Sequence, residues 1–417
     1  MSTTRSHTKE RDAAIRIIGA LRENGHTAYL AGGCVRDQLL GEIPKDYDVA
    51  TSAHPEHIAE LFKKTAAVGA AFGVMLVSDF GPTIEVATFR SDGPYTDARR
   101  PDHVHYSSPQ EDAKRRDFTI NALFLDPHED DDQIIDFVNG QADIKAKILR
   151  AVGDPDARLR EDHLRALRAV RFAARYGLTI DPKTSDAIRS HASELRGVSI
   201  ERIGHEIQRM MGHSSRASAA KMIQDLTLDA AIFTDSCSSE GIPTLTALDD
   251  QACSITAMAA WAHDRFGAGI LNRQEAASTK WDLKLDMSNH DKERFIATLE
   301  IAGLLISHWN EMSIPQRKRL ACRAHCCAGL TLARAINPET TKAIHRDIES
   351  MTNDGMGLSP KPLISGQTLI EMGQAPGESF KAVLDGVYDA QLEGKVDSFE
   401  SARNLAQELF VKLTKSD

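Results

Sequence analysis

The chain is 417 residues long, and its 41% hydrophobic and 26% charged residues are typical of a folded protein of about two to four domains. This composition excludes a mostly disordered chain, a collagen-like fibre and a small disulfide-stapled domain. Fifty Lys and Arg against 60 Asp and Glu give a net charge of −10. Taken alone, that charge argues against a protein that coats nucleic acid, because phosphate binding relies on clustered cations.

No run of about 18 apolar residues is present, so we expect no membrane span. The polar N-terminus lacks the apolar segment of a signal peptide. The six cysteines form no C-x-x-C pair, which favours a reduced, cytoplasmic compartment. Cys322, Cys326 and Cys327 lie close to His325, so a metal site stays open there beside the simpler interpretation of small apolar thiols.

Hydrophobic periodicity predicts a mixed α/β region followed by a helical one. Residues 11–24 read as an amphipathic helix, and residues 55–64 as a second helix that begins at Pro55. Strand-like runs occur at residues 27–30, 47–50, 74–78, 84–89 and 134–137. From about residue 155 onward helical patterns dominate, and the Gly-, Ser- and Pro-rich residues 355–362 are the best linker candidate. The fold class is therefore α+β at the N-terminus and all-α beyond it.

The first chemical motif combines adjacent glycines with a pair of aspartates. Gly32 and Gly33 follow a predicted strand and precede Arg36, a context in which the backbone can approach a phosphate. Asp46 and Asp48 form a D-x-D pair that, on a strand, points to one face and can hold hard divalent cations. Two such ions activate an attacking hydroxyl and neutralise a departing phosphate.

Glu85 lies within the apolar run of residues 84–89, where an unpaired carboxylate is costly. It is a candidate third carboxylate beside the metal pair. A solvent-facing position on an edge strand is the alternative.

Two arginine-rich segments follow. Arg115 and Arg116 suit phosphate through their bidentate guanidinium groups, and Asp117 and Asn121, four residues apart, share a face if helical and can reach a ribose hydroxyl. The alternative is a charged helix start held by ion pairs.

In the second segment arginines recur every three or four residues and line one side of a predicted helix, where they can follow a triphosphate or an RNA backbone. Asp162 and Arg165 offer an acceptor and a donor that can read a base edge, and a salt-bridged helix is the alternative. Residues 145–175 hold nine Lys or Arg against four Asp or Glu. The arginines of this row are Arg165, Arg168, Arg171 and Arg175.

Together these motifs resemble, in order, those of the class II tRNA nucleotidyltransferase and bacterial poly(A) polymerase family. The resemblance is dense from about residue 28 to 210 and weaker near the C-terminus, around residues 363–366 and 389–394. The motifs are Gly32-Gly33-Cys34-Val35-Arg36-Asp37, Asp46-Tyr47-Asp48, Arg115-Arg116-Asp117 and Glu161-Asp162-His163-Leu164-Arg165.

The resemblance implies a seahorse-like arrangement. A polymerase-β-like nucleotidyltransferase head at residues 1–150 would carry catalysis, and a helical neck at 151–215 would recognise the base. A helical body at 216–355 and an RNA-binding tail at 356–417 would follow.

It also implies roles for single residues. Asp46 and Asp48 would hold two Mg²⁺ ions, with Glu85 as the candidate third catalytic carboxylate. Asp162 and Arg165 would act as a protein template for the incoming base. The nucleotide would be bound by Gly32, Gly33, Arg36, Arg115, Arg116, Asp117, Asn121, Asp162, Arg165, Arg168 and Arg171.

The implied reaction is untemplated addition of C and A, or of one of them, to the 3′ end of tRNA, with ATP or CTP as substrate and release of pyrophosphate. Its partners would be the tRNA acceptor stem and 3′ end, with no membrane and no required protein partner. Poly(A) addition is the alternative within the family.

Three further expectations concern departures from the family and the remaining rivals. Ala98 stands in a loop segment, residues 95–102, where the family leads us to expect Gly, which favours a single-nucleotide specialist. His263 and Asp264 resemble a phosphohydrolase metal doublet. A catalytically silent RNA-binding protein is the rival from another class.

Overall fold

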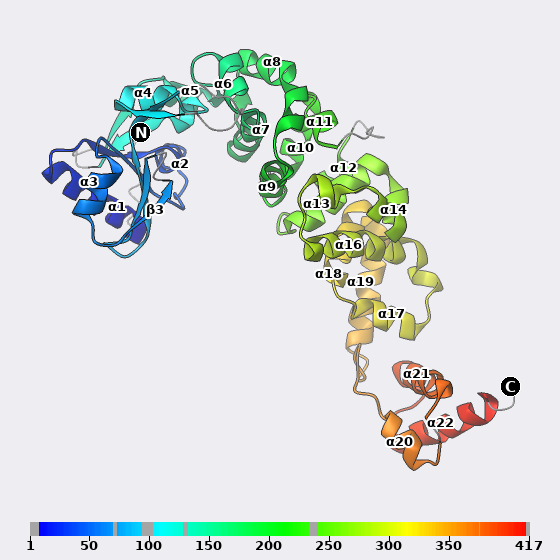
Figure 1. Ribbon diagram of the computed structural model, residues 1–417. Coiled ribbons are helices and arrows are strands. Elements are labelled where there is room, and N and C mark those ends of the chain that lie inside the picture. The colour runs from blue at the N-terminus through cyan, green and yellow to red at the C-terminus, as the bar shows by residue number, and fades with distance from the viewer. Residues whose placement is uncertain are drawn as a thin grey trace. The chain divides into compact units, whose positions relative to one another are not determined.

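The computed structural model of the protein describes residues 8–69, 73–93, 103–127, 132–233, 241–374 and 376–413 (Figure 1). The chain forms two compact units. The first comprises Met1–Met210 with Ser218–Ser236, and the second comprises Met211–Ala217 with Cys237–Asp417.

A seven-stranded sheet forms the centre of the first unit. Its order is β3-β4-β5-β2-β1-β8-β9, in which only the β2–β5 pair is parallel, and two small two-stranded sheets accompany it. The strands are β1 (Ala28–Ala31), β2 (Asp48–Thr51), β3 (Thr65–Gly69), β4 (Val74–Val77), β5 (Ile84–Thr88), β6 (Arg90–Asp92), β7 (Val104–Tyr106), β8 (Leu123–Asp126), β9 (Gln133–Asp136), β10 (Ile148–Leu149) and β11 (Thr179–Ile180).

Alternation along the strands gives the sheet two apolar faces. Leu30 and Val49 belong to the larger core, which α1 (Lys9–Glu23) covers with residues such as Ile17. Ala31 and Ala50, one residue further along, belong to a smaller cluster with Phe89, Ala113, Phe124 and Val152. Because Asp48 precedes Ala50 by two residues, its side chain lies on the face of this smaller cluster.

Helices complete the first unit. Pro at the first turn starts several of them, including α3, α6 and α8, as expected for a residue with fixed φ and no N–H. Their bounds are α2 (Gly33–Leu39), α3 (Pro55–Leu61), α4 (Pro109–Lys114), α5 (Gly140–Ala146), α6 (Pro155–Glu161), α7 (Arg165–Tyr176), α8 (Pro182–Ser190), α9 (Ile200–Met211), α10 (Arg216–Asp225) and α11 (Asp229–Phe233), with short 3₁₀ turns η2 (Thr119–Asn121) and η3 (Ala192–Gly197).

The second unit contains helices and no strand among its described residues. Its last three helices enclose a core of their own that includes Leu369, Val383 and Phe410. The helices are α12 (Pro243–Ala247), α13 (Ser254–Phe266), α14 (Arg273–Ser278), α15 (Trp281–Lys284), α16 (Asn289–His308), α17 (Ile314–Ala321), α18 (Cys326–Ile336), α19 (Pro338–Thr352), α20 (Gly366–Glu371), α21 (Glu378–Leu392) and α22 (Phe399–Leu413), with 3₁₀ turns η4 (Ala268–Leu271) and η5 (Trp309–Glu311).

The predicted fold class is confirmed: a sheet-containing head precedes a helical remainder. The five predicted strands correspond to β1, β2, β4, β5 and β9, and both predicted N-terminal helices are present. Strands β3 and β8 and the short β6, β7, β10 and β11 were not predicted. Residues 355–362, the linker candidate, contain no helix or strand. Within the described residues, no helix is long and apolar enough to cross a membrane.

Close packing of α16 against α18 makes Gly329 a critical position. A Cβ added at Gly329 would lie 2.7 Å from the Cβ of the fully buried Ile301. We expect Gly329→Ala to destabilise the second unit by about 1–2 kcal/mol, since overpacking outweighs the gain in helix propensity. The chain's three tryptophans, Trp261, Trp281 and Trp309, all lie in this unit, so urea unfolding followed by their fluorescence reports on it.

Gly269→Ala is the matched control. An added Cβ there would meet no heavy atom within 4 Å, so its urea midpoint should stay at the parent value. Equal midpoints for the two variants would show that the α16–α18 contact is not close packed.

Candidate functional site

The register of the sheet brings three sequence motifs to one place. Ala31 on β1 pairs with Asp48 on β2, so the Gly32-Gly33 turn begins directly beside that aspartate. Val49 pairs with Val86 in parallel register, which sets Glu85 next to Asp48 on the other side. Gly32 donates its N–H to the carbonyl oxygen of Leu123 at 3.0 Å, which joins the glycine turn to the first residue of β8.

Gly32 has a conformation that only glycine adopts readily. Its φ is +71° and its ψ is −118°, and a Cβ built there would lie 2.7 Å from Nη1 of Arg116. At Gly33, by contrast, a Cβ would meet only Nη2 of Arg36, at 3.7 Å. The first glycine therefore makes room for an arginine, and the second opens α2.

The predicted D-x-D pair is arranged around one half-buried carboxylate. β2 begins at Asp48, so Asp46 lies just before the strand rather than on it, and the buried Tyr47 between them points the other way. Burial, together with the charges of Glu85 and Asp46, raises the pKa of Asp48 to about 6 against the opposing effect of Arg116. Glu85 is exposed, as the solvent-facing alternative predicted, but its strand is not an edge strand, because β5 lies between β4 and β2.

No group of three or more His, Cys, Asp or Glu among the described residues is arranged to hold a metal ion. The donor set still fits Mg²⁺, which is usually bound by one or two carboxylates together with substrate phosphates. The negative charges of Glu85 and Asp46 act on Asp48 and contribute to its raised pKa. A bound cation would offset this repulsion among the three carboxylates.

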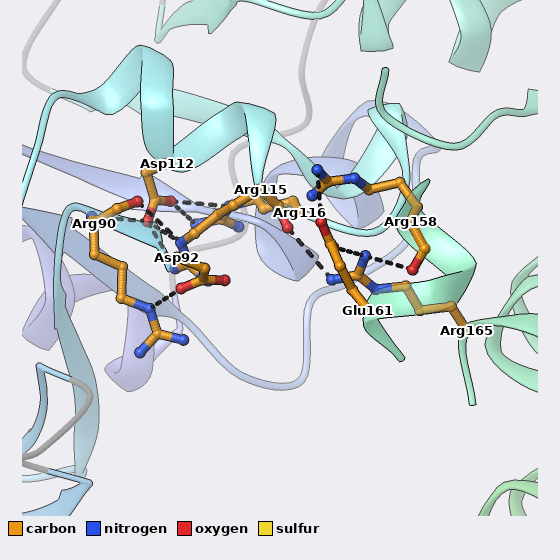
Figure 2. Close-up of polar contacts among 8 residues, drawn as sticks. All are labelled: Arg90, Asp92, Asp112, Arg115, Arg116, Arg158, Glu161 and Arg165. Carbon is orange, nitrogen blue, oxygen red and sulfur yellow. Dashed lines mark hydrogen bonds and ion pairs between the residues drawn. The ribbon is translucent and has the colours of Figure 1, made fainter. Parts of the chain in front are cut away.

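Arg115 and Arg116 are held by one buried carboxylate (Figure 2). Oδ1 of Asp112 accepts hydrogen bonds from Nε and Nη2 of Arg115, at 3.0 and 2.7 Å. Oδ2 accepts hydrogen bonds from Nε and Nη2 of Arg116, at 3.1 and 3.0 Å. Burial opposes ionisation of Asp112, but the two guanidinium groups outweigh it and lower its pKa. The ion pairs of the alternative interpretation are therefore present, at the end of α4 rather than at a helix start, and phosphate binding by the two arginines stays a prediction.

Asp117 and Asn121 meet in a turn rather than on an α-helix. α4 ends at Lys114, and η2 covers only Thr119–Asn121. Nδ2 of Asn121 donates to Oδ1 of Asp117 at 3.0 Å, while Nε and Nη2 of Arg168 donate to Oδ2 at 3.0 and 2.8 Å. Burial opposes ionisation of Asp117, and these donors, with Arg165, overcome it and lower its pKa.

The predicted arginine row is present on α7, and each of its first three members has an acidic partner. Arg165 donates to Glu161 at 2.6 Å and to the carbonyl oxygen of Arg158 at 3.0 Å (Figure 2). Arg168 pairs with Asp117, and Arg171 donates to Glu206 at 2.6 Å. Arg175 is exposed and does not join them.

Two charged residues of the site were not predicted. Arg202 on α9 donates to Oδ2 of Asp162 at 2.7 Å, while the N–H of Leu164 donates to its Oδ1 at 3.1 Å. Glu206, one turn along α9, accepts Arg171. The signal for them is the i, i+4 spacing of opposite charges, Arg202 and Glu206, on an amphipathic helix that follows a segment of complementary charge.

These residues surround one cavity of about 560 Å³. Arginines outnumber aspartates by six to three among its described lining residues, so positive charge is in excess. Asp46 and Glu85, both exposed, are not part of the lining. The lining residues are Gly32, Gly33, Arg36, Asp48, Arg115, Arg116, Asp117, Asn121, Asp162, Arg165, Arg168, Arg171 and Phe172.

The secondary candidates do not join this site. Asp264 accepts the backbone N–H groups of Thr244 and Leu245 at 2.9 and 2.8 Å, and His263 contacts the Thr244 hydroxyl at 2.9 Å. The doublet thus caps α12, a structural role. Cys322 and Cys327 are exposed free thiols and Cys326 is a buried one. Ala98 and the rest of residues 95–102 lie outside the described residues.

Comparisons with known proteins agree with this geometry. Residues 28–150 match the family described as "Poly A polymerase head domain", and residues 177–235 match that described as "Probable RNA and SrmB- binding site of polymerase A". The chain is 45% identical over 204 residues to a CCA-adding enzyme of Levilactobacillus brevis and 42% identical over 218 residues to one of Geobacillus stearothermophilus. These alignments cover 49% and 52% of this chain and 51% and 53% of the relatives, so the chain spans about half the length of the curated relatives it matches.

Similarity of fold extends further than similarity of sequence. The crystal structure of the Bacillus stearothermophilus CCA-adding enzyme in complex with CTP superposes with a TM-score of 0.78 at 27% identity, covering 99% of this chain and 100% of that one.

Fold and site together define a sheet-containing head joined to an arginine-bearing helix. The chain resembles the poly(A) polymerase head and RNA-binding families over residues 28–150 and 177–235, and its curated relatives are CCA-adding enzymes, so the resemblance that its motifs predicted is confirmed.

The glycine turn gives a first test of the site. We expect Gly32→Ala to lose stability by about 1–3 kcal/mol, because its φ disfavours any side chain, and to displace Arg116. Nucleotide affinity, measured by titration with CTP and ATP, should fall with it. Gly197→Ala is the control, since an added Cβ there would meet no heavy atom within 4 Å and Gly197 does not line the cavity, and equal affinities for the two variants would contradict this role for Gly32.

Proposed function

We propose that the protein adds C, A or both to the 3′ end of tRNA, without a nucleic-acid template and with release of pyrophosphate. The observation that carries this proposal is the single cavity in which Asp48 of the sheet faces a set of arginines from the head and from α7. Phosphoryl transfer depends mainly on positioning and charge neutralisation, and this cavity offers both.

The triphosphate is proposed to lie against Gly32, Arg36, Arg115 and Arg116. Guanidinium groups bind phosphate oxygens through paired N–H donors, and those of Arg115 and Arg116 are already fixed by Asp112. Little side-chain freedom is then lost when the nucleotide binds. The ribose would be recognised by Asn121 and Asp117, which hold each other in place.

Asp46 and Asp48 would hold Mg²⁺ ions, and Glu85 would add a third carboxylate nearby. The bound ions would lower the pKa of the attacking 3′-hydroxyl and stabilise the charge on the leaving pyrophosphate. Asp48, with its raised pKa, lies at the point where this positive charge is needed.

Asp162 and Arg165 are proposed to read the base, as the family resemblance implies. Both are fixed before any nucleotide arrives: Asp162 by Arg202 and the N–H of Leu164, and Arg165 by Glu161. Each therefore presents its remaining hydrogen-bonding groups in one orientation. Selection of a base by side chains in this way requires such rigidity, since discrimination depends on hydrogen bonds that only the correct base edge satisfies.

The remaining assignments follow the division made from the sequence. We assign catalysis to residues 1–150, base recognition to 151–215, a helical body to 216–355 and RNA binding to a tail at 356–417. The partners would be the acceptor stem and 3′ end of tRNA, presented as a single strand that can be positioned in the site. A cytoplasmic compartment and action without a required protein partner stay predictions of the sequence.

Poly(A) addition is the second candidate, favoured by the description of the family that matches residues 28–150. Incubation of the purified protein with labelled tRNA ending before CCA, tRNA ending in CC, and an unrelated RNA separates the two. CTP alone, ATP alone and both together identify the nucleotides used. Growth of a long A tail on every RNA would replace the tRNA proposal with this one.

Loss of the central carboxylate should abolish the reaction. We expect Asp48→Asn to lower the rate of incorporation by about 10²- to 10⁴-fold, because charge stabilisation through bound metal is worth several kcal/mol. Chelation of Mg²⁺ in the parent protein should have the same effect. Glu60→Gln, at an exposed position on α3, is the control, and retained activity of Asp48→Asn would refute the metal assignment.

Arg202 should control nucleotide choice rather than catalysis. Its bond to Asp162 fixes the proposed template, so Arg202→Gln is expected to lower the ratio of correct to incorrect nucleotide incorporation by about tenfold, given about 1.5–3 kcal/mol for a charge-assisted hydrogen bond. Arg202→Lys should recover part of the lost ratio of correct to incorrect incorporation, because the ammonium group can still donate to Asp162. The measurement is kcat/KM for CTP and ATP on one RNA, and a change that affects both equally would contradict the template role.

A further inference from the structure

Tyr176, the last residue of α7, reaches into the head and contacts the arginine of the glycine motif. Its hydroxyl donates to Oδ1 of Asp37 at 2.8 Å and accepts from Nη2 of Arg36 at 2.8 Å. Oδ1 of Asp37 also accepts Nε and Nη2 of Arg36 at 2.9 and 2.6 Å. The three side chains thus form a closed set of hydrogen bonds between α2 and the end of α7.

Arg36 is further held by a stack of rings. Its guanidinium carbon lies 4.7 Å from the centroid of Tyr176 and 5.0 Å from that of Phe172, and these two rings are nearly parallel, with an interplanar angle of 15°. Phe172 and Tyr176 are four residues apart and so share one face of α7. Cation–π contacts of this kind strengthen where water is excluded, and Arg36 is only 7% exposed.

The fourth partner of Arg36 is Asn121, one of the two residues proposed to recognise the ribose. Nη1 donates to Oδ1 of Asn121 at 2.6 Å. These bonds engage four of the five N–H groups of the guanidinium, which leaves one on Nη1 for a ligand in the cavity that Arg36 lines. The direction of that last donor is therefore fixed by Asp37, Asn121 and Tyr176 together.

We propose that Tyr176 is a positioning residue for the nucleotide triphosphate: it fixes Arg36 so that its free N–H meets a phosphate oxygen. The inference rests on the proposed function. Tyr176 acts through Arg36 and does not itself touch the nucleotide. Because the phosphates are common to all nucleotides, its contribution is the same for CTP and ATP. Equal effects on CTP and ATP distinguish Tyr176 from Arg202, which is proposed to orient the base-reading residue Asp162.

The variant Tyr176→Phe tests this, since it keeps the ring and removes only the hydroxyl. We expect KM for CTP and for ATP to rise by the same factor, about three- to tenfold, with kcat changed by less than about twofold. Inhibition by inorganic pyrophosphate should weaken by that same factor, because pyrophosphate offers the phosphate contact without a base. Tyr29→Phe is the control, as Tyr29 packs between Phe89 and Phe124 outside the cavity lining.

A double-mutant cycle shows whether Tyr176 works through Arg36. In an Arg36→Lys background, which lacks the planar fork, Tyr176→Phe should have no further effect on KM. Asp37→Asn is a second variant that weakens the same set of bonds and should raise KM for both nucleotides equally.

Unequal shifts for CTP and ATP, additive effects in the cycle, or a lowered melting temperature with unchanged KM would each overturn the inference. Absence of nucleotide incorporation by the parent protein would instead refute the proposed function, so the two failures are distinguishable.

Discussion

The ion pair between Asp117 and Arg168, in which Nε and Nη2 of the arginine both donate to Oδ2 of the aspartate, is the central contact of the site. Asp117 follows the arginine pair of the head, and Arg168 lies on α7, so the pair fixes the helix relative to the sheet. Both groups are partly buried, with the Asp117 side chain 11% and the Arg168 side chain 31% exposed, and burial of a charge is costly unless it is matched and hydrogen bonded. Asp117 meets that condition with donors from Arg168, Asn121 and the N–H of Phe118. Together with the contacts of Tyr176 to Arg36 and Asp37, this pair sets the separation between Asp48 and the proposed template.

The same principle is repeated around the cavity. Asp112 holds two arginines, Glu161 and Glu206 hold one each, and Asp37 holds Arg36. Clustered guanidinium groups repel one another, and an aspartate or glutamate behind each of them offsets that repulsion while directing its free N–H groups inward. The salt bridges of the alternative interpretation are thus present, and they do not exclude the proposed phosphate site. They would make that site rigid.

Local patterns predicted most of this site because its chemistry needs neighbouring residues. A D-x-D pair, adjacent glycines and arginines at helical spacing are visible without a fold. The described residues that line the cavity include all of the predicted site residues except Asp46 and Glu85. Arg202 and Tyr176 were missed because their partners, Asp162 and Asp37, are 40 and 139 residues distant in sequence. Strand β8 was missed because Leu123, Phe124 and Leu125 are all buried, which removes the alternation that identifies a strand.

The net charge of −10 and a cation-rich cavity are compatible because they concern different parts of the molecule. Acidic residues spread over the surface act at a distance and are screened by salt, whereas the arginines converge within one partly buried space where screening is weak. Each of the lining arginines is paired with an acidic side chain, so what the cavity offers is a set of oriented N–H donors more than a large net charge. Such donors are what the proposed triphosphate requires, because guanidinium groups bind phosphate oxygens through paired N–H groups. The acidic net charge of the whole chain therefore does not oppose the proposed binding at this place.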